Sequence, residues 1–130
     1  MIFVDANIPM YLVGADEALM QVTRSLTERA VESGEKLVTD AEVLQEILHR
    51  FAAIRRRDAI EPCTTLLLSL VDEVFSIDLE DVRRASTIIR SSDLSARDAL
   101  HLAVMQRRGI DRILTFDRAF DGVPGVTRLA

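Results

Sequence analysis

The segment Ser95–Phe120 constrains the fold of this chain most, because it joins a buried helix to a buried strand within a few residues. Its helical part is apolar almost all the way round, which is typical of a buried helix, and it ends at Gly109. The apolar run Ile113–Phe116 that follows predicts a buried strand. Asp98 and Asp117 stand at the two ends of this hydrophobic unit, where unpaired carboxylates would be costly. These two acids therefore need a structural or a chemical explanation.

Length and composition predict one domain with a hydrophobic core. The chain has 130 residues, of which 48% are hydrophobic, so a disordered chain is excluded and residues 1–130 are expected to form a single domain. No apolar run is long enough for a membrane span, and the N-terminus reaches Asp5 without the basic region of a signal peptide. Cys63 is the only cysteine, which excludes an internal disulfide and fits a cytoplasmic protein.

The charge balance argues against a general nucleic-acid binder, because the formal net charge is -5. The positive charges are nevertheless almost all arginine, and Lys36 is the only lysine. Arginine suits bidentate contacts with phosphate, although genome composition explains the same bias. Charge alone therefore leaves phosphate recognition open.

Apolar runs alternate with amphipathic segments along the whole chain, which predicts an α/β fold with a mostly parallel sheet. The predicted strands are 2–5, 37–39, 74–77, 113–116 and 126–129. The predicted helices are 7–14, 16–33, 40–57, 59–71, 78–90 and 96–108.

Four predicted strands lead directly into an aspartate, namely Asp5, Asp40, Asp78 and Asp117. In open α/β sheets, ligands bind beyond the carboxyl ends of the strands, but an aspartate there most often caps the next helix. Capping explains Asp40 and Asp78 well, because a periodic helix follows each of them. It explains Asp5 less well, since Asn7 is the better cap, and it explains Asp117 least.

Two further acids lie on predicted helices. Asp98 follows Ser95 at the spacing of a capping box, and Glu46 borders an apolar stripe with Arg50 one turn later as a surface partner. His101 shares a helical face with Asp98 and is most simply a partly buried, hydrogen-bonded histidine. From residue types alone, a shared acidic site and a set of unrelated caps and surface pairs both remain open.

Four motifs together decide between these alternatives. The chain carries V-D-A-N at 4–7, a helical Glu46, S-A-R-D-A-L-H at 95–101 and L-T-F-D-R-A-F at 114–120. In this order and spacing the set resembles PIN-domain ribonucleases, most of all the VapC-type toxins of toxin–antitoxin modules. Each motif is weak alone, but the resemblance covers essentially the whole chain. It implies a PIN-like three-layer fold, with a central sheet ordered 3-2-1-4-5 and flanked by helices.

The implied strand order selects the same acids as the motifs do. The topological switch point of such a sheet falls between strands one and four, and Asp5 and Asp117 leave these two strands. Glu46 and Asp98 would approach from helices beside that edge. The resemblance therefore implies that Asp5, Glu46, Asp98 and Asp117 are both the catalytic and the metal-binding residues.

The implied activity is that of a Mg2+-dependent endoribonuclease that hydrolyses phosphodiester bonds of transfer RNA or ribosomal RNA, with Mn2+ as the alternative metal. Four carboxylates suit a hard divalent cation, which takes oxygen ligands, and without a cation they would repel one another. Glu46 would ligate the metal or orient the attacking water.

Polar neighbours of the acids are expected to support the site. Side chains expected to hold the carboxylates in place are Asn7, Thr115 and Ser95. Arginines near the motifs are candidates for RNA contact, although ordinary surface solvation explains them equally well. These are Arg50, Arg97 and Arg118.

The resemblance also implies partners: a VapB-type antitoxin that inserts a side chain into the acidic site, a second copy of the chain in a homodimer, and no membrane. The rival function is a catalytically silent PIN-like scaffold or RNA-binding module, which four retained acids disfavour. A haloacid-dehalogenase-like phosphatase needs a second aspartate where Asn7 stands, and a receiver domain needs a lysine that Lys36 does not supply.

Overall fold

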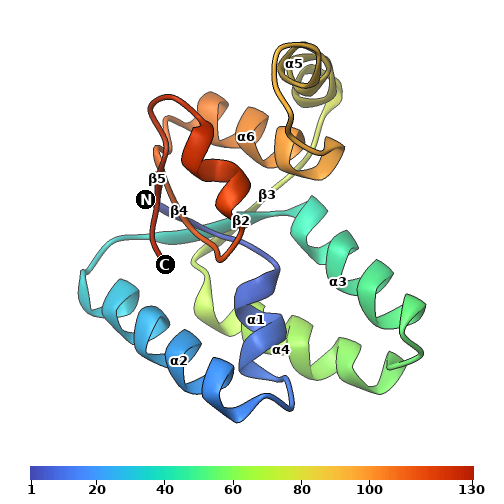
Figure 1. The fold of residues 1–130 in the computed structure, drawn as a ribbon, viewed down its shortest axis with the longest axis vertical. Helices are drawn as coiled ribbons and strands as arrows, with labels where there is room; N and C mark the ends of the chain where they lie inside the picture. The colour runs from blue at the N-terminus through green and yellow to red at the C-terminus, as the bar shows by residue number, and fades with distance from the viewer.

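A five-stranded, fully parallel sheet organises the structure, a computed structural model that describes residues 1–130 (Figure 1). The strand order is β3-β2-β1-β4-β5, and every neighbouring pair is parallel. This confirms both the α/β class and the 3-2-1-4-5 order. The strands are β1 (Ile2–Val4), β2 (Leu37–Asp40), β3 (Glu73–Phe75), β4 (Arg112–Leu114) and β5 (Thr127–Arg128).

Helices cover both faces of the sheet. Figure 1 shows α1, α2 and α4 on one side, and α6 with the short 3-10 helix η2 on the other, with α5 lying against α6 away from the sheet. None of the helices is both long enough and apolar enough to cross a membrane. The helices are α1 (Asn7–Leu12), α2 (Glu17–Glu32), α3 (Ala41–Ala53), α4 (Ile60–Leu70), α5 (Leu79–Arg90) and α6 (Ala96–Arg108), with the 3-10 helices η1 (Arg57–Ala59) and η2 (Arg118–Gly122).

The core is centred on β1 and β4, whose pairing joins the two ends of the chain. Phe3 lies opposite Ile113 in the register, and both side chains are fully buried. Phe120 of η2 is fully buried in the same cluster. The middle of α6, from His101 to Met105, is buried as well, as expected for a helix that is apolar on most of its surface.

Several predicted boundaries were wrong, each for a local reason. The arginine triplet at 55–57 does not close α3, because the helix ends at Ala53 and Arg55 adopts a left-handed conformation with φ 57°. Thr115 and Phe116 do not continue β4, because the Thr115 hydroxyl and the Phe116 N–H are engaged by side chains from the other end of the chain. Strand β5 is likewise shorter than predicted.

The helix starts follow the predicted caps at three places. Asp40 caps α3 by accepting a hydrogen bond of 3.0 Å from the Val43 N–H, whereas the Thr39 hydroxyl donates to the carbonyl oxygen of Val4 instead. Asp78 and Asp81 form a reciprocal capping box at the start of α5. Ser95 caps α6, which ends at Gly109 in the left-handed conformation expected of a glycine there.

An ion pair between a buried aspartate of α5 and a partly exposed arginine of α6 joins these two helices. Arg107 of α6 donates two hydrogen bonds, both of 2.8 Å, to the carboxylate of Asp81, and it also donates to the carbonyl oxygen of Ser76 at 3.1 Å. The Asp81 side chain is only 1% exposed. A bidentate pair in this setting fixes both the distance and the orientation of the two helices.

Candidate active site

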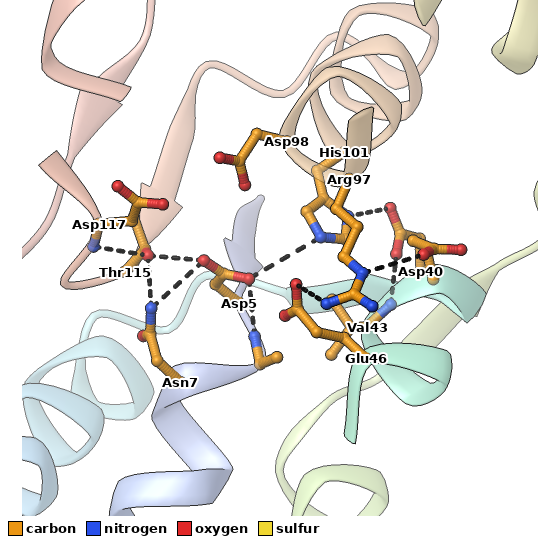
Figure 2. Close-up of polar contacts among 12 residues, drawn as sticks. Asp5, Asn7, Asp40, Val43, Glu46, Arg97, Asp98, His101, Thr115 and Asp117 are labelled. Atoms are coloured by element: carbon orange, nitrogen blue, oxygen red, sulfur yellow. Dashed lines mark hydrogen bonds and ion pairs between the residues drawn. The ribbon is translucent and has the colours of Figure 1, made fainter. Parts of the chain in front are cut away.

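The four predicted acids gather beyond the carboxyl ends of β1 and β4, the topological switch point of the sheet (Figure 2). Asp5 follows β1 and Asp117 follows β4, whereas Glu46 comes from α3 and Asp98 from the first turn of α6. Figure 2 shows Asp5 in the middle, with Asp117 to its left, Asp98 above it and Glu46 to its lower right.

Asp5 is the centre of the cluster and its most buried acid, with 4% of the residue exposed. One carboxylate oxygen, Oδ1, accepts a hydrogen bond of 2.7 Å from the Ala6 N–H. The other, Oδ2, accepts one of 2.6 Å from the Thr115 hydroxyl. A buried carboxylate with a donor on each oxygen is held in one orientation.

Thr115 and Asn7 tie the ends of β1 and β4 together. The Asn7 amide donates to Thr115 Oγ1 at 3.0 Å, and Asn7 Oδ1 accepts from the Phe116 N–H at 3.3 Å. Thr115 Oγ1 also accepts from the Asp117 N–H at 3.1 Å. The sequence predicted that Asn7 caps the first helix, and this prediction was wrong. The residue before α1 is Ala6, and no side chain caps the helix. The Asn7 side chain instead supports the acidic cluster.

Asp98 and Asp117 form one side of the cluster. Ser95 Oγ accepts a hydrogen bond from the backbone N–H of Asp98 at 3.2 Å, so Ser95 fixes the turn that carries this acid. Asp117 Oδ1 accepts from the Ala119 N–H at 2.9 Å. Burial, followed by the charges of Asp117 and Asp5, raises the pKa of Asp98 to about 6.

Glu46 forms the other side. Burial, followed by the charge of Asp5, raises the pKa of Glu46 to about 7, although His101 and Arg97 act in the opposite direction. Arg97 Nη1 lies 3.7 Å from Glu46 Oε1, and Arg97 Nε lies 3.7 Å from Glu42 Oε1. The pairing of Glu46 with Arg50 that the sequence allowed does not form.

The three arginines predicted as candidates for RNA contact differ in their position relative to the acidic cluster. Arg97 is half-buried among the acids, whereas Arg50 and Arg118 are exposed and no ion pair joins either of them to the cluster. Glu42, which the sequence reading did not connect with the site, shares Arg97 with Glu46. Glu42 lies one helical turn before Glu46 on α3, and this spacing was the feature of the sequence that could have linked Glu42 to the site.

A buried histidine lies behind the cluster. His101 Nδ1 is 2.8 Å from Asp40 Oδ2, and both side chains are 0% exposed. His101 Nε2 lies 3.9 Å from Asp5 Oδ1. Burial opposes a charged imidazole, but the hydrogen bond with Asp40 and the charges of Asp40, Asp5 and Glu46 outweigh it and raise the pKa of His101 to about 9.

The donor set fits a divalent cation. Asp5, Glu46 and His101 each offer one ligand atom, and these atoms lie within 4.8 Å of one another. The pKa values of Glu46 and Asp98 are raised first by burial and then by neighbouring acids, despite the nearby Arg97 and His101, and a bound cation would offset this repulsion. These crowded acids, with Asp5 held in place by hydrogen-bond donors, can therefore bind a metal ion. The cluster contains no serine or cysteine that could act as a nucleophile.

The stability of the metal-free protein is expected to fall as the pH rises from about 5 to about 9. The pKa of Glu46 rises from 4.5 to about 7 and that of Asp98 from 3.8 to about 6, so the folded state binds more protons than the unfolded state in this window. His101 acts in the same direction at higher pH: its contribution is complete below 6.5 and is lost as the pH passes about 9.

Thermal unfolding in EDTA across this pH range measures the effect. Glu46→Gln is expected to flatten the fall between about pH 5 and pH 7, because the substituted amide does not titrate. A melting temperature that rises over the same pH range would contradict the raised pKa values of Glu46, Asp98 and His101.

Comparison with known proteins identifies a matching domain family and several similar proteins. Residues 2–126 match the PIN domain family. Ribonuclease VapC13 of Mycobacterium tuberculosis is 53% identical over 131 residues, which cover 100% of both chains. Ribonuclease VapC23 of the same species is 42% identical over 118 residues, which cover 90% of this chain and 93% of its own.

Solved structures share the fold. The crystal structure of Mycobacterium tuberculosis VapC20, described as a sarcin-ricin loop cleaving toxin, has a TM-score of 0.75 at 22% identity and covers 97% of this chain and 98% of its own. A toxin–antitoxin complex from Klebsiella pneumoniae has a TM-score of 0.68 at 19% identity, covering 98% of this chain and 96% of that one. At these identities the likeness concerns the fold alone.

Proposed function

This chain belongs to the PIN domain family and to its VapC group, and from that premise we propose that it is a Mg2+-dependent endoribonuclease, the toxin of a toxin–antitoxin module. The proposed reaction is hydrolysis of phosphodiester bonds in transfer RNA or ribosomal RNA, leaving a 5′-phosphate and a 3′-hydroxyl. Mn2+ is the alternative metal.

One observation carries the proposal: four carboxylates from four separate elements meet at the switch point of the sheet, around a buried Asp5 that has a donor on each oxygen. Helix capping does not explain Asp5 or Glu46, since neither caps a helix in this structure. Bringing such acids together is unfavourable without a cation, as the raised pKa values of Asp98 and Glu46 indicate. We infer that the cluster serves metal binding and catalysis.

Each part of the cluster has a distinct proposed task. A bound divalent cation would lower the pKa of a water molecule and polarise the scissile phosphate. Asp5, Asp98 and Asp117 would hold the ion, with Asp5 kept in orientation by Thr115. Glu46, whose pKa is raised to about 7, is suited to ligate the ion or to accept a proton from the attacking water near neutral pH.

Arg97 is the best-placed residue for the RNA backbone. It lies beside the acids and holds Glu42 and Glu46 only through contacts of 3.7 Å, longer than a direct hydrogen bond. A phosphate entering the site would offer its guanidinium a stronger, charge-assisted partner. Arg50 and Arg118 remain candidates for more distant phosphate contacts.

We also propose a VapB-type antitoxin as the partner, and a homodimer as the state of the toxin. Solved structures of the same fold include a toxin–antitoxin complex from Klebsiella pneumoniae and VapBC2 from Rickettsia felis. On this chain, large apolar side chains are exposed along α2 and α3, and we propose that these two helices line a groove for the antitoxin. These side chains include Val22, Val31 and Leu48, each about half exposed.

Cleavage of purified transfer RNAs and ribosomal RNA tests the proposed function. The protein is incubated with Mg2+ or Mn2+, with EDTA, and beside an Asp98→Asn variant prepared identically. We expect cleavage at defined sites that needs both the metal and Asp98. Cleavage that persists in the variant would identify a contaminant, and a folded, antitoxin-free protein that binds no metal and cleaves no RNA would support the scaffold function instead.

A further inference from the structure

Among the buried side-chain nitrogen and oxygen atoms, only Nε2 of His101 has no hydrogen-bond partner in this structure. The side chain is fully buried, and its other nitrogen, Nδ1, lies 2.8 Å from Asp40 Oδ2. The distance of 3.9 Å from Nε2 to Asp5 Oδ1 is too long for a hydrogen bond. A buried polar atom without a partner is unfavourable, so it needs an explanation in the function of the site.

The surroundings of the imidazole determine which nitrogen is available. Asp40 also caps α3 by accepting from the Val43 N–H, so its carboxylate is fixed on one side by a helix and on the other by His101. A carboxylate accepts hydrogen bonds, and Nδ1 is therefore the nitrogen that carries a hydrogen toward it. This leaves Nε2 on the side of Asp5 and Glu46. A carboxylate behind one nitrogen of a histidine is the usual arrangement when the other nitrogen binds a metal.

We propose that His101 Nε2 is a metal ligand on the Glu46 side of the cluster, where it completes a set of two carboxylates and one imidazole with Asp5 and Glu46. The three ligand atoms lie within 4.8 Å of one another and come from the residue that follows β1, from α3 and from α6. A cation held by these three groups would supply the partner that the buried Nε2 lacks.

A nitrogen ligand makes this half of the site select among cations. Mg2+ takes oxygen ligands almost exclusively, whereas first-row transition metals, Mn2+ included, also accept an imidazole nitrogen. With His101 as a ligand, the Glu46 side is expected to prefer Mn2+ over Mg2+, while the side formed by Asp98 and Asp117 offers only oxygen. The inference rests on the proposed metal-dependent function and assigns it a further ligand.

The chain offers a clean spectroscopic test, because it has only two histidines. His49 is exposed on α3, so the His49→Asn protein carries His101 as its single imidazole. Electron spin echo spectra of this protein with bound Mn2+ are expected to show the modulation of an imidazole nitrogen. Mn2+ bound without that modulation would overturn the inference and leave the proposed function standing. Failure to bind either Mn2+ or Mg2+ would overturn both.

His101→Asn supplies the matched variant, since an asparagine amide can still donate to Asp40 while nothing replaces Nε2. Mn2+ binding measured by calorimetry is expected to weaken about 10- to 100-fold, with a smaller loss for Mg2+ and with the nitrogen modulation gone. An equal loss for both metals would indicate that His101 only positions Asp5, and would count against ligation. If His101→Asn fails to fold, the His49→Asn spectrum still decides the question.

Discussion

Asp5→Asn is expected to reduce ribonuclease activity at least about 10²- to 10³-fold, the scale seen when one group that stabilises a transition state electrostatically is removed. Asp5 lies between the two sides of the acidic cluster, so its loss weakens both. Metal affinity is expected to fall together with activity, because an amide oxygen is a neutral and weaker ligand for a hard cation.

The same substitution is expected to leave the metal-free fold intact or more stable. Asparagine can still accept one of the two hydrogen bonds that Ala6 and Thr115 donate to Asp5, and removing its charge relieves repulsion with Glu46 and Asp98. The measurements are single-turnover cleavage, metal titration and thermal unfolding of the same preparations.

Asp111→Asn is the control, because this acid is exposed and lies outside the cluster. It should leave both the cleavage rate and the metal affinity unchanged. An Asp5→Asn protein that retains normal metal affinity would exclude Asp5 as a ligand, even if its activity were low.

Asp81→Ala is expected to lower the free energy of unfolding by about 2 to 3 kcal/mol. The substitution removes the carboxylate that receives both hydrogen bonds from Arg107, and it removes one half of the capping box with Asp78. Arg107 is partly exposed and can recover some solvation, which is why the expected loss lies below that of a fully buried pair. Denaturant unfolding measures the change.

Glu80→Ala on the same helix is the matched control. Glu80 pairs with Arg83 at 3.1 Å, but both side chains are largely exposed, so its removal should change the stability by about 0.5 kcal/mol or less. Equal losses from the two variants would mean that the Asp81–Arg107 pair contributes no more than a surface pair.

The alternation of apolar and amphipathic segments predicted the α/β class, whereas the strand order followed only from the family resemblance that the four motifs carry. It also pointed to Asp5, Glu46, Asp98 and Asp117, which the structure brings together, although their catalytic roles stay a prediction. Thr115 and Asn7 were named as supporting residues, and both hold the cluster through side-chain hydrogen bonds.

Contacts between distant residues could not be predicted in the same way. Asp40 had a sufficient local explanation as a helix cap, so nothing in the sequence pointed to its second partner, His101, 61 residues later. Glu46 had a plausible local partner in Arg50, yet it lies near Arg97, because α6 packs beside α3. The spacing of residues along one helix predicts contacts within that helix, but it does not predict which other helix packs beside it.

The hydrogen bond between Thr115 and Asp5 spans 110 positions of the chain, and this separation has a consequence for synthesis. A growing polypeptide can pair β1 with β2 early, but it cannot bring Asp117 and Thr115 to Asp5 until β4 has left the ribosome. The acidic centre is thus one of the last features to assemble during translation. A nascent chain therefore carries no complete acidic centre until its synthesis is nearly finished.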